Sequence, residues 1–256
     1  MIGFNARGMA AIYKFELART WRTLFESIAS PVLTTSLYFL VFGSAIGGSI
    51  QTIGGVPYAA FIVPGLLMLT ILSESTANAS FGIYLPRFTG TIYELLSAPV
   101  GVPEMLVGYI GAAATKSLIL AAIILATARL FVDYSILHPL LAAGFIVLIA
   151  VTFSLLGFIL GCWANGFEKL QVVPMLVITP LSFLGGTFYS IAMLPEPWRS
   201  VTLANPIVYL VNGLRWTFYG RADVSFAASA GLTLAFLVIC VAVISWIFKT
   251  GWRLRS

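Results

Sequence analysis

Charged residues are scarce in this sequence: they make up 9% of its 256 residues, against roughly 25% in an ordinary soluble domain. Hydrophobic residues make up 60%, so the polar surface that a soluble fold needs is missing. One stretch free of charge runs from Ser27 to Ser73, which is long enough for two membrane helices of about 20 residues each. The turn-forming Gly54-Gly55-Val56-Pro57 divides it into a hairpin. We therefore expect an integral membrane protein.

Sequence signatures of several catalytic and binding classes are also missing. The sequence has no phosphate-binding G-x-x-x-x-G-K-[ST] loop, no H-E-x-x-H and no cysteine–histidine cluster. Cys162 and Cys240 are far apart, and the single histidine, His138, falls at the expected end of a span. We expect no catalytic, cofactor-binding or metal-binding residues. The net charge is +5, and most of the basic residues lie near expected span ends, which is typical of membrane topology and not of nucleic-acid binding.

The apolar runs predict an all-α, polytopic membrane protein that forms a single domain over residues 1–256. Six transmembrane helices are expected, at about 31–50, 58–79, 104–128, 139–162, 170–189 and 226–248. An even number of spans puts both termini on one side of the membrane. Basic residues at both ends, among them Arg22 and Lys249, place that side in the cytoplasm.

Residues 7–28 precede the first span and have helical periodicity. Apolar residues such as Tyr13, Leu17 and Trp21 recur at spacings of three and four, whereas Glu16 and Arg19 fall on the opposite side. This pattern is typical of an amphipathic helix that lies in the membrane interface. An ordinary cytosolic lead-in helix is the alternative.

The segment 191–221, between spans five and six, is too long for a hairpin turn and too apolar for a free loop. Pro195 and Pro197 would stop a helix, and Asn205-Pro206 can start another. Irregular backbone at membrane depth survives only where it is buried in protein or lines a wet cavity. The segment therefore predicts two short re-entrant or interfacial helices on the extracytoplasmic side, at about 195–203 and 206–219.

Two ionisable residues, Glu74 and Lys116, fall inside expected spans. Charge at membrane depth is expensive and by default suggests function. Glu74 either snorkels to the cytoplasmic surface or lines a pathway. Lys116 either pairs with Glu74 in a structural role or takes part in a pathway or gate.

Four segments, taken in order, carry a family resemblance. They are the N-terminal helix running into Ser30-Pro31-Val32, the loop from Arg87 to Pro99, the stretch from Thr179 to Ser190, and the stretch from Leu194 to Arg215. In this order and spacing the chain resembles the ABC-2-type permeases, the membrane subunits of ATP-binding-cassette exporters. The likeness is greatest to a bacterial inner-membrane transport permease subgroup.

The resemblance implies partners that composition does not reveal. Two copies of the chain would pair and bind two copies of a separate ABC ATPase subunit. ATP and Mg²⁺ would be bound by that partner, so this chain would bind no cofactor and would not itself be an enzyme. A short coupling helix at about 87–97 would dock on the ATPase, with the contact candidates Arg87, Gly90, Glu94, Leu95 and Leu96.

The resemblance also assigns roles at the other end of the chain. The segment 191–221 would cap the pathway, with the candidates Pro195, Trp198, Asn205, Pro206, Tyr209 and Arg215. Spans one, two and five would line the interface between the two copies.

We therefore expect the permease subunit of an exporter in the bacterial inner membrane, embedded in membrane lipids, with an amphipathic substrate such as a lipid, a lipid-linked glycan or a drug. The expected wall of the pathway is aromatic and includes Tyr38, Phe42, Phe183, Phe188 and Tyr189. The same residues suit helix packing equally well. The alternative function, from another class, is an ion-coupled secondary transporter that uses Glu74 and Lys116.

Overall fold

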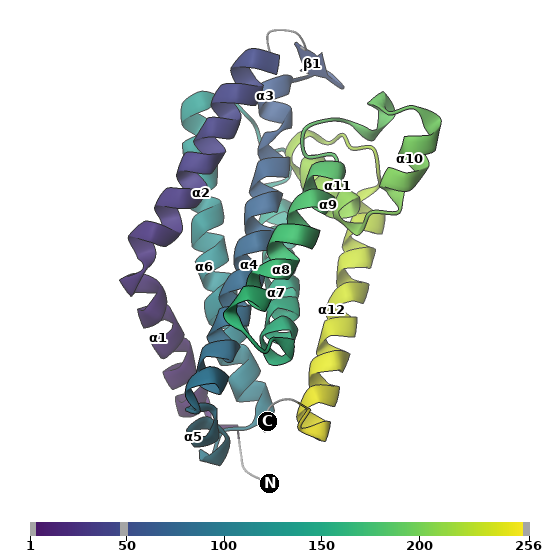
Figure 1. Ribbon diagram of the computed structural model, residues 1–256. Helices are drawn as coiled ribbons and strands as arrows, with labels where there is room; N and C mark the ends of the chain where they lie inside the picture. The colour runs from purple at the N-terminus through teal and green to yellow at the C-terminus, as the bar shows by residue number, and fades with distance from the viewer. Residues whose placement is uncertain (1–3, 47–50, 253–256) are drawn as a thin grey trace.

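The computed structural model describes residues 4–46 and 51–252 and is built almost entirely of helices (Figure 1). The first half contains α1 (Ala6–Arg22), α2 (Leu24–Tyr38), the π-helical segment η1 (Phe39–Ile46), the two-residue strands β1 (Thr52–Ile53) and β2 (Val56–Pro57), α3 (Tyr58–Phe61), α4 (Val63–Thr89), α5 (Ile92–Ser97) and α6 (Val102–Phe131). The second half contains α7 (Pro139–Trp163), α8 (Phe167–Val173), the π-helical segment η2 (Pro174–Ile178), α9 (Thr179–Leu184), the 3₁₀ turn η3 (Ile191–Met193), α10 (Glu196–Leu203), α11 (Pro206–Tyr219) and α12 (Phe226–Thr250).

Membrane-spanning length is reached repeatedly within the described residues. Five helical stretches are long and apolar enough to cross a membrane, at 58–89, 102–131, 139–163, 167–184 and 226–250. A sixth span results if the helices at 6–22 and 27–43, which meet at 60°, count as one. The predicted all-α, polytopic fold class is confirmed.

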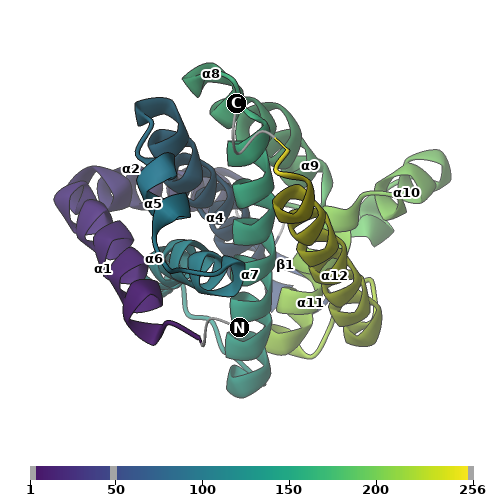
Figure 2. The ribbon, with the colours of Figure 1, turned by 90° about the horizontal axis from the view of Figure 1, so that it is seen from below.

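The two ends of the bundle differ in what they carry. In Figure 1, the start of α1, the end of α12 and the short helix α5 lie at one end, whereas β1, α3 and α10 lie at the other. Seen from the α5 end in Figure 2, α1 and α2 form one edge and α12 and α10 the opposite edge, with α6 and α7 between them. Both termini of the described chain are therefore on the same side of the bundle.

Helix α4 lies in the centre of the bundle because small residues let its neighbours approach closely. At Gly157 and Gly161 of α7, an added methyl group would collide with the backbone oxygens of Thr76 and Ser80 in α4. Small residues four apart on a helix permit this backbone approach in membranes, where packing replaces the hydrophobic effect. The fully buried Met68 and Leu72 continue the same core along α4.

The fifth span is shorter than expected. Its last helix, α9, ends at Leu184 and not near 189, because Gly185 and Gly186 follow and Gly186 has a left-handed φ of 79°. Phe188 and Tyr189 therefore lie in the connecting segment, not on a helix. For the first span, residues 47–50 of the expected range lie outside the described residues.

The short helices agree with the expected positions at one end of the bundle and differ from them at the other. α10 and α11 occupy the places expected for two re-entrant helices, and the Asn205 side chain caps α11 by accepting a hydrogen bond from the backbone N–H of Ile207 at 2.9 Å. The expected coupling helix, in contrast, is shorter than 87–97. The second span runs on to Thr89, Gly90 ends it with a φ of 80°, and α5 begins only at Ile92.

The orientation of α1 differs from the sequence expectation. Glu16, placed on the polar side by its periodicity, is only 4% exposed and faces α4 and α6, whereas Trp21 is 64% exposed. A carboxylate can be buried there because Arg19 accompanies it with an Nη2–Oε2 distance of 2.5 Å, and because Gly82 of α4 leaves room. The face of α1 that packs on the protein therefore contains Ile12, Glu16 and Thr20, whereas Arg22 of the expected polar side is exposed.

Candidate translocation groove and coupling surface

A groove of about 230 Å³ lies between α2, α4 and α9. Its lining is rich in hydroxyl groups and contains one carboxylate. The polar lining residues are Ser30, Thr34, Thr35, Thr70, Ser73, Thr179 and Glu74. These side chains come from the three spans that the family resemblance assigns to the interface between two copies.

Glu74 and Lys116 are joined through a third residue, Asn78. The Asn78 amide donates to Glu74 Oε2 at 3.1 Å, and its carbonyl oxygen accepts from Lys116 Nζ at 2.5 Å. Glu74 lines the groove, whereas Lys116 is 7% exposed and lies behind it on α6. The two residues considered together from sequence thus occupy different positions: one faces the groove and the other supports it. Lys116 is held by Asn78, so its positive charge balances the Glu74 carboxylate although Lys116 is not reached from the groove.

Four of the five predicted aromatic wall residues form one cluster at an end of the groove. Tyr38 lies 5.7 Å from Phe188 and 6.2 Å from Phe183, and Phe42 stacks on Phe188 at 4.3 Å between ring centroids. Tyr189 is separate from these rings and donates its hydroxyl to the backbone oxygen of Leu184. Tyr38 belongs both to the cluster and to the groove, so the hydroxyl-lined part adjoins an aromatic part.

Helix α5 presents a polar edge and turns its apolar edge inward. Glu94 is exposed and Tyr93 is 55% exposed, whereas Ile92 is buried and Leu95 and Leu96 pack on a core cluster. Of the predicted contact candidates, Glu94 and Gly90 are therefore on the surface, and the two leucines hold α5 on the bundle.

Arg87 is turned away from this surface. Its Nη1 donates to the backbone oxygen of Gly161 at 2.7 Å and of Ala164 at 3.4 Å, at the C-terminal end of α7. Carbonyl groups at a helix end have no partner within the helix, and a cation is favourable there. The structure gives Arg87 a role in joining α4 to α7.

The start of α1 is fastened to the loop that follows α5. Asn5 donates from its side chain to the backbone oxygen of Pro99 and from its backbone to Glu104 at the start of α6, both at 2.9 Å. The Asn5 side chain also caps α1 by accepting from Gly8. Helices α1, α5 and α6 are thus connected at the end of the bundle that carries α5.

The predicted capping residues lie in and around α10 and α11. Asn205 donates to the backbone oxygen of Leu181 and Tyr209 to that of Leu203. Pro195 and Pro206 precede or begin these helices, Trp198 is 63% exposed on α10, and Arg215 is buried beneath them.

Apart from Glu74, the residues that give the groove its polarity were not predicted from the sequence. Asn78 follows Glu74 by four residues on one helix, a spacing that places both side chains on the same face. That spacing was the usable signal. The hydroxyl residues gave no comparable signal, because serine and threonine are common in membrane helices and bond to their own backbone.

The arrangement is that of a membrane permease. It combines a bundle of spanning helices, a polar groove on one side, short helices at one end and an exposed helix at the other.

Within the described residues, no group of three or more histidine, cysteine or acidic side chains is placed to hold a metal ion.

Comparison with known proteins identifies the family. A family model described as ABC-2 type transporter matches residues 8–219. The chain is 35% identical over 248 residues to the inner membrane transport permease YadH of Escherichia coli K12, covering 97% of both proteins. It is 22% identical over 219 residues to nodulation protein J of Rhizobium leguminosarum bv. viciae, covering 85% of this chain and 83% of that protein. The chain belongs to the ABC-2 type transporter family.

It follows that the chain is a multi-pass inner-membrane permease subunit and not the ATPase of its transporter. Membership of this family implies an ATPase partner.

Proposed function

We propose that two copies of this chain form one export pathway for an amphipathic molecule, driven by two copies of an ABC ATPase subunit. The observation that carries this proposal is the size and position of the groove. At about 230 Å³ it is smaller than the roughly 300–1,000 Å³ of typical small-molecule sites. Two such grooves facing each other would enclose a space within that range.

The lining of the groove supports an amphipathic substrate. Hydroxyl groups such as those of Thr34 and Ser73, together with the Glu74 carboxylate, offer hydrogen bonds to a polar head group. The adjoining ring cluster around Phe188 offers an apolar surface to the remainder. Lipids, lipid-linked glycans and hydrophobic drugs all combine these properties.

Coupling to ATP would occur at the end of the bundle that carries α5, and both termini would then lie in the cytoplasm. The partner ATPase would bind ATP and Mg²⁺ and, on closing, push on the exposed Tyr93 and Glu94. Because Asn5 joins α1 to the loop after α5 and to α6, such a push would move several spans together, as in domain closure generally.

The alternative of an ion-coupled transporter has less support. Such a mechanism would use titratable groups reached from the pathway, and of its two residues only Glu74 lines the groove, whereas Lys116 lies behind Asn78. Family membership also assigns the energy source to an ATPase.

The proposal is tested by co-expression of the tagged chain with the ABC ATPase encoded beside it. We expect a stable complex in mild detergent with two copies of each subunit, measured as a mass in solution, and ATP hydrolysis in lipid. Recovery of the chain without an ATPase, while its fold and membrane abundance are normal, would refute the proposal.

A further inference from the structure

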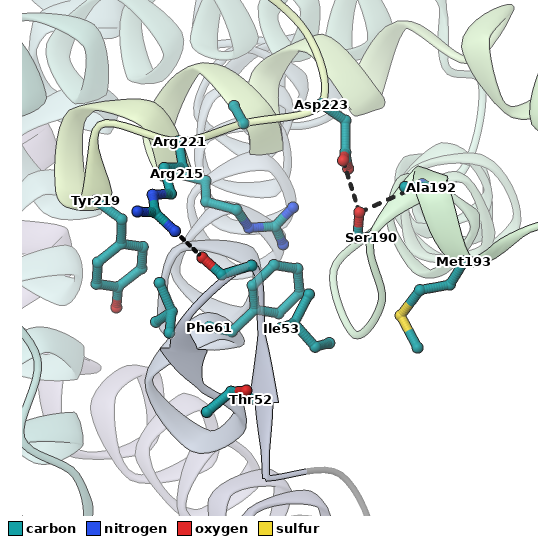
Figure 3. Close-up of a pocket in the computed structure, with 13 residues that line it drawn as sticks. Thr52, Ile53, Phe61, Ser190, Ala192, Met193, Arg215, Tyr219, Arg221 and Asp223 are labelled. Carbon is teal, nitrogen blue, oxygen red and sulfur yellow. Dashed lines mark hydrogen bonds between the residues drawn. The ribbon is translucent and has the colours of Figure 1, made fainter.

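A second cavity, of about 500 Å³, lies at the end of the bundle opposite α5 (Figure 3). It is enclosed by the strands before α3, the turn that contains Ser190 and Ala192, and the end of α11. Its lining combines apolar side chains with two arginines and one aspartate. The apolar side chains are Ile53, Val56, Phe61, Ala192, Met193 and Ala222.

Arg215 is the most deeply buried charged group in this cavity. It is 3% exposed, its Nη2 donates to the backbone oxygen of Gly186 at 2.7 Å, and its guanidinium lies 3.7 Å from the centre of the Phe61 ring. Its Nε and Nη1 atoms are buried and, among residues 4–46 and 51–252, have no hydrogen-bond partner. A buried cation with unused donors is costly, so these atoms mark where a ligand would be stabilised.

The other charged residues of the cavity, Asp223 and Arg221, form no hydrogen bonds with the unused nitrogens of Arg215 within the described residues. The carboxylate of Asp223 already accepts from Ser190 Oγ at 2.6 Å and from the Ile191 backbone N–H at 2.9 Å. Within the part of the chain that the structure describes, Arg215 makes no ion pair with it. Arg221 adds a second positive charge and donates to the backbone oxygen of Gly54 at 2.5 Å. The cavity is therefore positive on balance.

Figure 3 shows the guanidinium of Arg215 over the Phe61 ring, with Arg221 and its bond to one side and Ser190 with Asp223 to the other. Ile53 lies next to Phe61, and Met193 lies on the side of Ala192 and Ser190. A molecule entering here meets an apolar wall beside Arg221, with the unused donors of Arg215 buried directly behind that wall.

We infer that this cavity binds a phosphate group carried by an amphipathic molecule. Arg215 would donate to phosphate oxygens from Nε and Nη1, and Arg221 would add charge from the cavity wall. Guanidinium groups are well suited to phosphate, and such charge-assisted bonds are stronger than neutral ones. The apolar lining would hold part of an attached chain.

The test measures binding directly on the full chain in an uncharged maltoside detergent, so it does not depend on ATP, export or a partner. Three probes are titrated: dioctanoyl phosphatidic acid, dioctanoylglycerol with the same tails but no phosphate, and inorganic phosphate. We expect phosphatidic acid to bind roughly tenfold or more tightly than dioctanoylglycerol, as one charged hydrogen bond allows. Equal binding of these two lipids would overturn the inference.

Inorganic phosphate separates the two sources of the ligand. Competition by phosphate with an affinity well below that of phosphatidic acid would assign the site to a lipid-like molecule. Equal affinity would assign it to free phosphate and would leave the apolar lining without a role.

Variants locate the binding in this cavity. Arg215→Met should abolish the preference for phosphatidic acid. Met193→Glu, at a position 51% exposed on the cavity wall, should weaken phosphatidic acid binding roughly tenfold without disturbing the core. The control Val201→Glu, 63% exposed on α10 and outside the lining, should leave it unchanged. Unchanged binding in Met193→Glu would refute the assignment even if Arg215→Met fails to fold.

Discussion

The groove beside α4 and the cavity at the end of α11 each contain a charged side chain, half-buried Glu74 in the groove and buried Arg215 in the cavity, and they balance that charge differently. In the groove, Glu74 accepts from Asn78, which in turn accepts from Lys116. In the cavity, Arg215 donates from one nitrogen to the backbone oxygen of Gly186, and its other two nitrogens have no hydrogen-bond partner within the described residues. The charge of Glu74 is therefore balanced by residues of this chain, whereas Arg215 retains donors that a ligand could use.

The largest expected effect breaks the balance in the groove. Lys116→Met leaves Glu74 and Asn78 without their cation, and removal of one partner from a buried charged pair costs roughly 3–5 kcal/mol. We expect a clear fall in the apparent melting temperature of the purified chain. The double variant Glu74→Gln/Lys116→Met should recover much of that loss; equal losses in both variants would contradict the idea that Lys116 balances Glu74.

The next effect compares the two ends of the bundle by one charge reversal at each. Glu94→Lys on α5 should lower substrate-stimulated ATP hydrolysis by the complex roughly tenfold, since a lost charged contact is worth about 1.4 kcal/mol or more. The matched control is Glu196→Lys on α10, also exposed but at the opposite end. Similar hydrolysis in both variants would remove the coupling role from α5.

A smaller effect probes the hydroxyl lining of the groove. Thr34→Val keeps the shape of the side chain and removes one hydrogen-bonding group, which is worth about 1 kcal/mol and hence roughly fivefold in substrate affinity. Affinity is read from the substrate concentration that half-stimulates hydrolysis. Thr127→Val, on α6 outside the groove, is the control, and an equal effect there would mean that the groove hydroxyls do not contact substrate.

The smallest change in melting temperature is expected for Arg215, whose guanidinium has unused donors. Arg215→Met removes two unsatisfied nitrogens as well as one hydrogen bond and a ring contact, so gains and losses of about 1–2 kcal/mol each nearly cancel. We expect a melting temperature close to that of the unaltered chain when no ligand is present. A fall as large as that of Lys116→Met would show that Arg215 is structural, as Lys116 is.

The fold was predictable where local signals decide it. The apolar runs define the spans, and Asn205-Pro206 contains both the cap and the first residue of α11. The signal failed at the fifth span, where apolar residues continue past the end of α9 and only Gly185-Gly186 marks the turn. An apolar run indicates that a segment lies within the membrane, but it does not show where the helix ends.

The sites were less predictable, because their charges are balanced by residues distant in sequence. Glu16 is buried because Arg19 pairs with it and because Gly82 of α4, distant in sequence, leaves room for its carboxylate. Arg215 gave no sign in the sequence that two of its nitrogens would lack partners, since that follows from where Gly186, Phe61 and Asp223 lie around it.

The central claim is that the groove is one half of a pathway completed by a second copy, and cysteine cross-linking in membranes tests it most directly. With Cys162 and Cys240 replaced by alanine, a single cysteine is placed at Leu37 on α2, 60% exposed beside the groove, or at Val238 on α12, 63% exposed. We predict a cross-linked dimer for Leu37→Cys and none for Val238→Cys. A dimer through Val238→Cys alone would place α12 at the interface and contradict the account.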